Sequence, residues 1–433
     1  MMSQQVKASG IGADTQNPAV ARADGVSSKV PSGKGHIGAL DFIRALAIIH
    51  IVIYHWYIEW YNGSFLIVPE GVAANIPRLE LFKDGGVLGA LKNLFSFLFA
   101  YGFTSVNLFL LLSGFVLTYS LLTRPAAIKW LSFLRKRIKR VFIPFYISVA
   151  IGVGFLFLRN FLFPALGAAP IYDWIDGLKL LFFPFAFYDI QFLQKFNGDY
   201  WFIPLILQLY LVFPLLYLML KKWGPARFLA VVFVATVSYR FLAAYFLDSV
   251  PMGVIYPASN SYRLFSFFLP RLFEFGLGMA LAYLQIKSGS FIERVGCKIC
   301  FIAGMFFSFA GFAMNAYQWG WIFSDMVVAA GLFFFFLGIA RAIGTRSATG
   351  KIMSRISGAS YELFLFHHYF LNYFLMPLVV TLGIRNETAF WLLMPLYLAA
   401  VILIGEGGRR LSALADVLWN GLFRRRRSRS VGR

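Results

Sequence analysis

The sequence has 433 residues, of which 59% are hydrophobic and only 14% are charged, and its mean hydropathy is +0.70. Soluble domains carry about 25% charged residues, so this composition excludes an ordinary soluble globular protein. The apolar residues come in runs of about 17 to 25, the length at which a helix crosses the hydrocarbon of a bilayer. Helices satisfy their backbone polar groups within one segment, so the sequence predicts an all-α, polytopic transmembrane bundle.

The formal net charge is +21. In a soluble protein this charge would favour a nucleic-acid partner, but here the Lys and Arg residues must first be placed relative to the membrane. The RRRRSR run near the C-terminus is typical of a cytoplasmic anchor on anionic headgroups, and we expect membrane lipid and no nucleic acid as its partner. Cys297 and Cys300 are the only cysteines. No second pair completes a zinc site, so we expect them to be structural.

In chain order, residues 1–35 are rich in Gly, Ala, Ser and Asp and predict a disordered tail without the apolar core of a signal peptide. A transmembrane domain at 36–406 follows, and a basic tail at 407–433. The ten predicted spans are 39–60, 104–123, 141–163, 200–220, 228–247, 265–286, 299–317, 324–342, 357–382 and 389–406. Residues 87–103 and 177–188 are also apolar, but short or interrupted, and predict interfacial or re-entrant segments.

The distribution of Lys and Arg gives the orientation. With ten spans, basic residues are several times more frequent in the tails and alternate loops on one side than in the loops on the other side. The positive-inside rule therefore places both termini in the cytoplasm and the chain in the plasma (inner) membrane as a multi-pass protein.

Ionisable residues within spans are functional candidates, and the first span, LDFIRALAIIHIVIYHWYIEW, contains several. Arg44 and His55 are eleven residues apart, which places them on one helix face with about 16 Å of rise between them. Glu59 lies one turn beyond His55 and is expected to accept a hydrogen bond from its imidazole. A histidine in this setting suits proton transfer near neutral pH, although the spacing fits a packing histidine equally well.

A basic segment, SFLRKRIKRVFIPFY, leads into the third span. Arg137 and Arg140 are three residues apart there and enter the span from the predicted cytoplasmic side. Arginine pairs offer fixed bidentate donors that suit phosphate groups. Anchoring to anionic lipid explains the same residues, so both interpretations remain open.

Two later spans hold further ionisable groups. Arg271 lies three residues before Glu274, which predicts a structural ion pair within one helix. The ninth span contains Tyr361, His367 and His368. Adjacent residues point in different directions on a helix, so we expect at most one of the two histidines to share a cavity with Tyr361 and His55. The sequence supplies no further ligands for them, so it predicts no metal site.

Six segments of this sequence resemble the motifs of the acyltransferase family 3 membrane proteins. LDFIRALAIIHIVIYH resembles the first-helix motif, in which ten residues separate an Arg from a His, and Arg44 and His55 match it. DYWFIPLILQLYLVFPLL resembles the central helix, with Trp201 and Gln208 at its Trp and Gln positions. The remaining four segments are NLFLLLSGFVLT, FLRKRIKRVFIPFY, RLFEFGLGMALAY and SYELFLFHHYF. Together they cover most of residues 38–375 in the order of the family.

The resemblance implies a ten-helix bundle that transfers an acyl group, usually acetyl, from acyl-coenzyme A at the cytoplasmic face. The acceptor is a hydroxyl of a polysaccharide or lipid-linked sugar at the outer face. Arg137 and Arg140 would hold the phosphates of the coenzyme. His55 would act as general base or as a transient acyl carrier. Arg44 would position the thioester or stabilise negative charge on its oxygen.

The sequence departs from the family pattern at two positions, Asn107, where Asp is common, and Glu362, where Gly follows the Ser-Tyr pair in many members. We expect acyl-coenzyme A as the co-substrate and no metal cofactor, and the further candidate site residues are Trp201, Gln208, Arg271, Glu274, Tyr361 and His367. A transporter or flippase without acyl chemistry is the alternative function, because the chain has many spans and a polar first helix.

Overall fold

The structure is a computed structural model that describes residues 37–61, 67–79, 85–123, 128–167, 175–176, 179, 193, 196–251, 253–254, 264–289 and 291–430. These residues are almost entirely helical, and the described part of the chain contains no β-strand, only two isolated bridges. The prediction of an all-α protein is therefore confirmed. The predicted N-terminal tail and almost all of 177–188 lie outside the described residues.

The helices are α1 (Gly38–Trp60), α2 (Val72–Leu79), α3 (Gly86–Ala100), α4 (Ser105–Leu122), α5 (Trp130–Leu162), α8 (Phe202–Phe246), α9 (Leu272–Ser288), α10 (Phe291–Arg294), α11 (Cys297–Asn315), α12 (Ser324–Ile343), α13 (Ala348–Gly358), α14 (Ser360–Phe370), α15 (Met376–Thr381) and α16 (Glu387–Ser430). Two short segments matter for the site. They are the 3₁₀ turn η4 (Gly198–Trp201) and the π-helical turn η8 (Leu371–Leu375).

Eight helical segments of the described chain are long and apolar enough to cross a membrane. One of them, Gly198–Phe246, contains two helices, because Gly224 interrupts α8 with φ 76° and ψ 170°. Its halves match the predicted spans 200–220 and 228–247. The 17-residue α9, predicted as a span, is not among the eight. The chain is thus a multi-pass membrane protein, while the count of ten spans and the orientation stay predictions.

Two segment boundaries differ from those expected. Helix α3, predicted as a separate interfacial segment, continues through the 3₁₀ turn Gly102–Thr104 into α4. Helix α16 continues past the predicted boundary at residue 406 and remains helical to Ser430. Most of the chain between 39 and 406 otherwise follows the predicted order of apolar segments.

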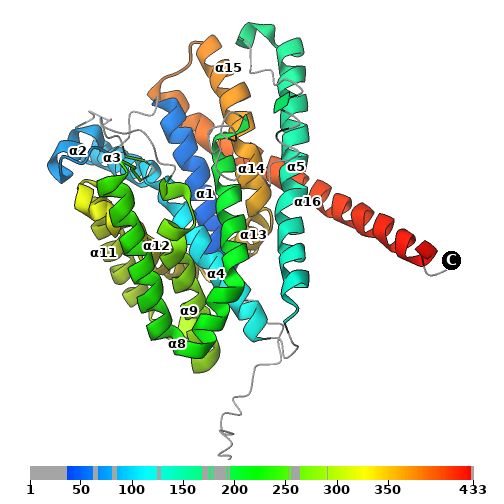
Figure 1. Ribbon diagram of the computed structural model, residues 1–433. Coiled ribbons are helices and arrows are strands. Elements are labelled where there is room, and N and C mark those ends of the chain that lie inside the picture. The colour runs from blue at the N-terminus through cyan, green and yellow to red at the C-terminus, as the bar shows by residue number, and fades with distance from the viewer. Residues whose placement is uncertain are drawn as a thin grey trace, which may run out of the picture. The chain divides into compact units, whose positions relative to one another are not determined.

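Helix α1 contacts α4, α12, α13, α14 and α16, and Figure 1 shows it among these helices. Helices α4 and α9 approach closely because glycines face each other's backbone. A Cβ added at Gly278 would lie 1.8 Å from the Leu111 carbonyl oxygen. Small residues allow this close packing, which compensates for the weak hydrophobic drive between helices in lipid.

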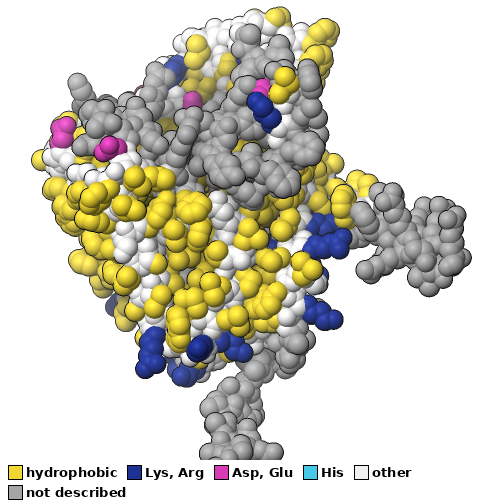
Figure 2. Space-filling model, viewed as in Figure 1, with side chains coloured by type: hydrophobic (Ala, Val, Ile, Leu, Met, Phe, Trp, Pro, Cys, Tyr) yellow, Lys and Arg dark blue, Asp and Glu magenta, His cyan; other side chains and the backbone are white. Residues whose placement is uncertain are grey.

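Figure 2 shows hydrophobic side chains over most of the described surface on the visible face. Lys and Arg side chains gather at the lower edge of this view, and the few visible Asp and Glu side chains lie towards the upper edge. An apolar belt with charged residues at its ends is expected of a protein that crosses a bilayer.

Candidate active site

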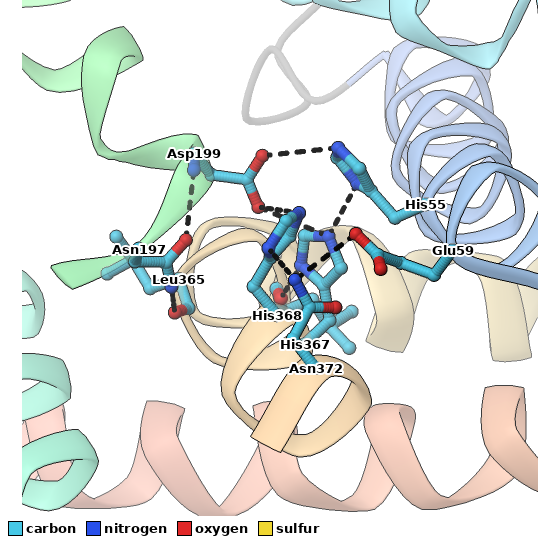
Figure 3. Close-up of polar contacts among 9 residues, drawn as sticks. His55, Glu59, Asn197, Asp199, Leu365, His367, His368 and Asn372 are labelled. Carbon is cyan, nitrogen blue, oxygen red and sulfur yellow. Dashed lines mark hydrogen bonds and ion pairs between the residues drawn. The ribbon is translucent and has the colours of Figure 1, made fainter. Parts of the chain in front are cut away.

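Four ionisable side chains from three segments converge inside the helices (Figure 3). They are His55 of α1, Asp199 of η4, and His367 and His368 of α14, and we call them the histidine cluster. One ligand atom from each lies within 4.8 Å of the ligand atoms of the other three. Asp199, His367 and His368 are buried, and the His55 side chain is only 12% exposed.

The carboxylate of Asp199 faces all three imidazoles. Its Oδ1 lies 3.5 Å from His55 Nε2, and its Oδ2 lies 3.2 Å from His367 Nε2 and 3.8 Å from His368 Nε2. The closest contact in the cluster joins His55 Nδ1 and His367 Nε2 at 2.9 Å. Among the described residues Asp199 forms no ion pair with Lys or Arg, and the basic groups that face its carboxylate there are imidazoles.

The loop before η4 holds Asp199 in place. The Asn197 side chain accepts a hydrogen bond from the Asp199 backbone N–H at 2.9 Å and donates to the Leu365 carbonyl of α14 at 2.9 Å. Gly198 is needed between them, because a Cβ there would lie 2.9 Å from Cε1 of the His368 ring. The local sequence Asn-Gly-Asp therefore fixes the carboxylate against the two histidines of α14.

A second layer of polar contacts surrounds the histidine cluster. His367 Nδ1 lies 3.0 Å from the Leu363 carbonyl, which can only accept a hydrogen bond. Asn372, in the π-helical turn, places its Nδ2 3.3 Å from both His368 Nδ1 and Glu59 Oε1. π-helical turns are frequent at functional sites, and this one brings an amide between the cluster and Glu59.

Two expectations about these residues are corrected. Among the described residues, Glu59 accepts from Asn372 and not from His55, whose nitrogens instead face Asp199 and His367. Both adjacent histidines reach His55, with ring centroids 4.9 Å and 4.3 Å away. Neighbouring side chains diverge by only about 100° on a helix, so they can flank one imidazole that approaches between them.

A cavity of about 940 Å³ is lined by Arg44, which lies about three helical turns from His55 along α1. It is lined by α1, α4, α5, α8, α13, α14 and α16. Its basic side chains are Arg44, Arg135, Lys136, Arg137, Lys139, Arg140 and Arg409, and its acidic side chains are Asp41, Glu362 and Asp416. Arg44, Arg137, Arg140 and Tyr361 therefore line one cavity, which we call the arginine cavity.

Individual contacts define the surface of the arginine cavity. Arg44 is 23% exposed and lies 3.8 Å from Asp41. The guanidinium of Arg137 lies over the Phe133 ring at 5.3 Å. Tyr361 donates to the Val141 carbonyl at 3.1 Å, so it belongs to this cavity and not to the histidine cluster.

The arginine cavity and the histidine cluster adjoin at Phe364. This residue lines the cavity, and its ring centroid lies 6.3 Å from that of His367. Phe202 also lines the cavity, packs on Phe364 at 5.4 Å and follows η4 directly. Two aromatic rings thus separate the cavity from the cluster.

Arg271 belongs to a separate buried network that joins α4, α8, α9 and α12. Its predicted partner Glu274 lies 3.8 Å away, whereas Asp325 lies at 2.6 Å and also pairs with Arg240. Asn107 donates to Asp325 and accepts from Arg271, both at 2.7 Å. We call this the arginine network. The predicted structural role of Arg271 agrees with its place in this network, but its closer carboxylate partner is Asp325 of α12 and not Glu274.

The remaining predicted residues lie outside the cluster itself. Trp201 is buried in η4, two residues after Asp199, and Gln208 accepts from the Phe268 backbone N–H at 3.2 Å. Cys297 and Cys300 are free thiols in α11, with hydrogen-bond distances of 3.5 Å and 3.9 Å to backbone carbonyls.

Sequence reasoning missed Asp199 and the role of Asn372. Asp199 stands directly before an apolar run, where an acidic residue is a common feature of helix starts, so nothing marked it as part of a site. Its only distinguishing signal is the Asn-Gly-Asp turn in front of an aromatic helix start.

Comparison with protein families gives one match. The family model Acyl_transf_3, described as an acyltransferase domain, matches residues 37–405, which span α1 to most of the apolar part of α16. No curated protein and no solved structure matches the chain. The matched range includes the histidine cluster, the arginine network and all of the arginine cavity except its lining residues in the last part of α16. The chain therefore belongs to acyltransferase family 3.

Proposed function

We propose that this protein is a membrane O-acyltransferase that moves an acyl group, most often acetyl, from acyl-coenzyme A to a hydroxyl of a polysaccharide or lipid-linked sugar. One observation carries the proposal. A basic cavity large enough for a nucleotide cofactor adjoins a buried histidine–carboxylate cluster, and α1 supplies Arg44 to the first and His55 to the second.

The arginine cavity suits the donor. Small-molecule sites typically enclose about 300–1,000 Å³, and this cavity of about 940 Å³ can hold much of a coenzyme A molecule. Arg137 and Arg140 would bind its phosphates through charge-assisted, bidentate hydrogen bonds. Arg44, about three helical turns from His55 on α1, would then contact the donor between its phosphates and its thioester end.

The histidine cluster suits proton transfer. His367 Nδ1 faces a carbonyl and so carries its hydrogen, which leaves His367 Nε2 to accept from His55 Nδ1. His55 Nε2 is then the basic nitrogen, and Asp199 at 3.5 Å would stabilise the imidazolium that forms.

The proposed reaction balances with these residues. His55 Nε2 takes the proton of the acceptor hydroxyl, the oxygen attacks the thioester carbonyl, and the C–S bond breaks. The leaving coenzyme A thiolate receives the proton from His55. A transient acyl group on His55 gives the same overall balance, and trapping an acylated His55 peptide by mass spectrometry would identify that route.

The orientation follows from the charge distribution. Lys and Arg are concentrated on the side of the membrane to which the arginine cavity belongs, which supports a cytoplasmic position for this cavity in a plasma (inner) membrane. His55 then lies towards the outer side, where the carbohydrate acceptor approaches.

A deletion strain tests the function in the cell. We expect mass analysis of its surface glycans to show loss of acetyl groups, and a plasmid copy of the wild-type gene to restore them. A copy with His55→Ala should fail to restore them, whereas His50→Gln should succeed, because His50 bonds to Ser105 and Leu98 outside the cluster. Unchanged glycan acylation in the deletion strain would contradict the proposal. Substrate flux in vesicles that persists in His55→Ala would favour the transporter alternative.

A further inference from the structure

The histidine cluster has the donor set of a metal centre. Three imidazoles and one carboxylate are typical ligands of zinc and related divalent transition metal ions. We propose that His55, Asp199, His367 and His368 bind one such ion, with zinc as the preferred metal. The binding of an ion can be tested without acyl transfer, but it bears on the mechanism proposed above, because an ion bound to His55 would replace this histidine as the base.

The spacing of the ligand atoms fits a tetrahedral ion. Bonds of about 2.0–2.1 Å to nitrogen and oxygen place neighbouring ligands of such an ion about 3.3–3.4 Å apart. With one ligand atom taken from each side chain, all four lie within 4.8 Å of one another, and Asp199 Oδ2 lies 3.2 Å from His367 Nε2 and 3.8 Å from His368 Nε2. The separations begin near the required value and extend beyond it, so the side chains would draw closer together around one ion.

The hydrogen positions favour a cation at the centre. With its hydrogen on Nδ1, His367 has one lone pair on Nε2, which either accepts from His55 Nδ1 at 2.9 Å or binds an ion, and the same nitrogen lies 3.2 Å from the acceptor Asp199 Oδ2. Two acceptors at this distance repel each other unless a cation lies between them. Moreover, Asp199 Oδ2 and His368 Nε2 are buried without a hydrogen-bond partner among the described residues, which is costly for polar atoms.

The surroundings resemble the second layer of a metal site. Histidine ligands commonly donate their other ring N–H to a backbone carbonyl, as His367 does to Leu363. His368 differs, because Asn372 donates to its Nδ1 and thereby places its hydrogen on Nε2. Binding through His368 therefore requires its ring or the amide to turn. His55, Asp199 and His367 are the three firm ligands, and His368 is an exchangeable fourth.

The alternative to a metal ion in the histidine cluster is an additional proton. It would make His55 an imidazolium that donates to both His367 and Asp199. This arrangement leaves His368 Nε2 unsatisfied, whereas an ion engages all four side chains. The two occupants also assign His55 different parts in catalysis, since a metal ligand is not free to act as the base.

Metal analysis of the purified protein distinguishes these occupants. The full chain is purified through an affinity tag without histidines, incubated with zinc sulfate, desalted and analysed by inductively coupled plasma mass spectrometry. We expect about one zinc ion per chain, and a cobalt-loaded sample with the visible absorption of a four-coordinate ion. Zinc at background level and no cobalt spectrum would overturn the proposal and leave the proton as occupant.

Variants assign the ion to the cluster. Asp199→Asn and His367→Ala should each lower zinc content and remove the cobalt spectrum, while His50→Gln should retain both. Asp199→Asn keeps the side-chain volume, so a normal size-exclusion profile shows that any loss of metal is not caused by misfolding. Zinc retained in both cluster variants would contradict the assignment.

Coenzyme A release measured on the same samples separates this inference from the proposed function. Turnover by a protein that binds no metal overturns only the metal proposal. A zinc-loaded protein without turnover on any carbohydrate acceptor overturns only the proposed function.

Discussion

The histidine cluster and the arginine network both place one aspartate among basic side chains inside the helices, yet they differ in the kind of base. Asp325 contacts Arg240 and Arg271, which keep their charge at every accessible pH. Asp199 contacts three imidazoles, which can be neutral, protonated or bound to an ion. A fixed ion pair favours a structural role, whereas groups that change their charge suit catalysis.

The neighbourhood of the two clusters supports this difference. In the arginine network, Asn107 donates a hydrogen bond to Asp325 and accepts one from Arg271, and the network joins helices that lie side by side. The histidine cluster adjoins the arginine cavity through Phe364 and keeps unsatisfied buried atoms. The comparison therefore predicts that variants of one cluster change activity and variants of the other change stability.

Replacing His55 should have the largest effect. We expect His55→Ala to lower kcat by about a thousandfold, since general-base catalysis contributes roughly 10²–10⁴. Release of the coenzyme A thiol by purified protein measures this. The melting temperature should change little. If His55→Ala instead lowered stability and kept its kcat, the histidine cluster would be structural and not catalytic.

Replacing Asp325 should act on stability. We expect Asp325→Asn to lower the free energy of unfolding by about 3 kcal/mol, because it leaves two buried arginines without their shared carboxylate. Thermal unfolding in detergent measures the change. Asp199→Asn is the matched control, with the same substitution in the other cluster, and should lower turnover more than stability. Equal stability losses in both variants would remove the distinction.

Removing the arginine pair of the cavity should affect the donor. We expect the double variant Arg137→Gln, Arg140→Gln to raise KM for acyl-coenzyme A about a hundredfold or more, since each charge-assisted hydrogen bond contributes about 1.5–3 kcal/mol. The melting temperature should be unchanged. Lys221→Gln, Lys222→Gln removes the same charge from exposed positions outside the cavity and should leave KM unchanged. An equal rise in both variants would mean that net charge, and not a specific site, attracts the donor.

Replacing Glu59 should have the smallest effect. Among the described residues, Glu59 reaches the histidine cluster through Asn372. We therefore expect Glu59→Gln to lower kcat about two- to fivefold, the value of one weakened hydrogen bond. A loss as large as that of His55→Ala would show that Glu59 itself takes part in proton transfer.

The fold was predictable to the extent that it depends on apolar segments. Runs long enough to span the bilayer predicted the all-helical architecture and the positions of α1, α4, α11 and α12. The sequence did not predict that α3 joins α4 or that α16 continues beyond residue 406, because polar or short segments carry no strong hydropathy signal there.

The site was predictable only within single helices. Spacing along α1 and α5 identified Arg44, His55, Arg137 and Arg140, and three of these line the arginine cavity. Contacts between helices were not predictable, because they depend on packing and not on spacing. Asp199 therefore escaped notice, and Arg271 was assigned a neighbour on its own helix although Asp325 lies closer.

Transfer of a labelled acetyl group tests the central claim most directly. Purified protein is given acetyl-coenzyme A labelled in its acetyl group together with deacylated surface glycan, and the label on the glycan and the binding of coenzyme A are measured in the same samples. The account predicts label transfer by the wild-type protein, and normal coenzyme A binding without transfer by His55→Ala. Undiminished transfer by His55→Ala would contradict it.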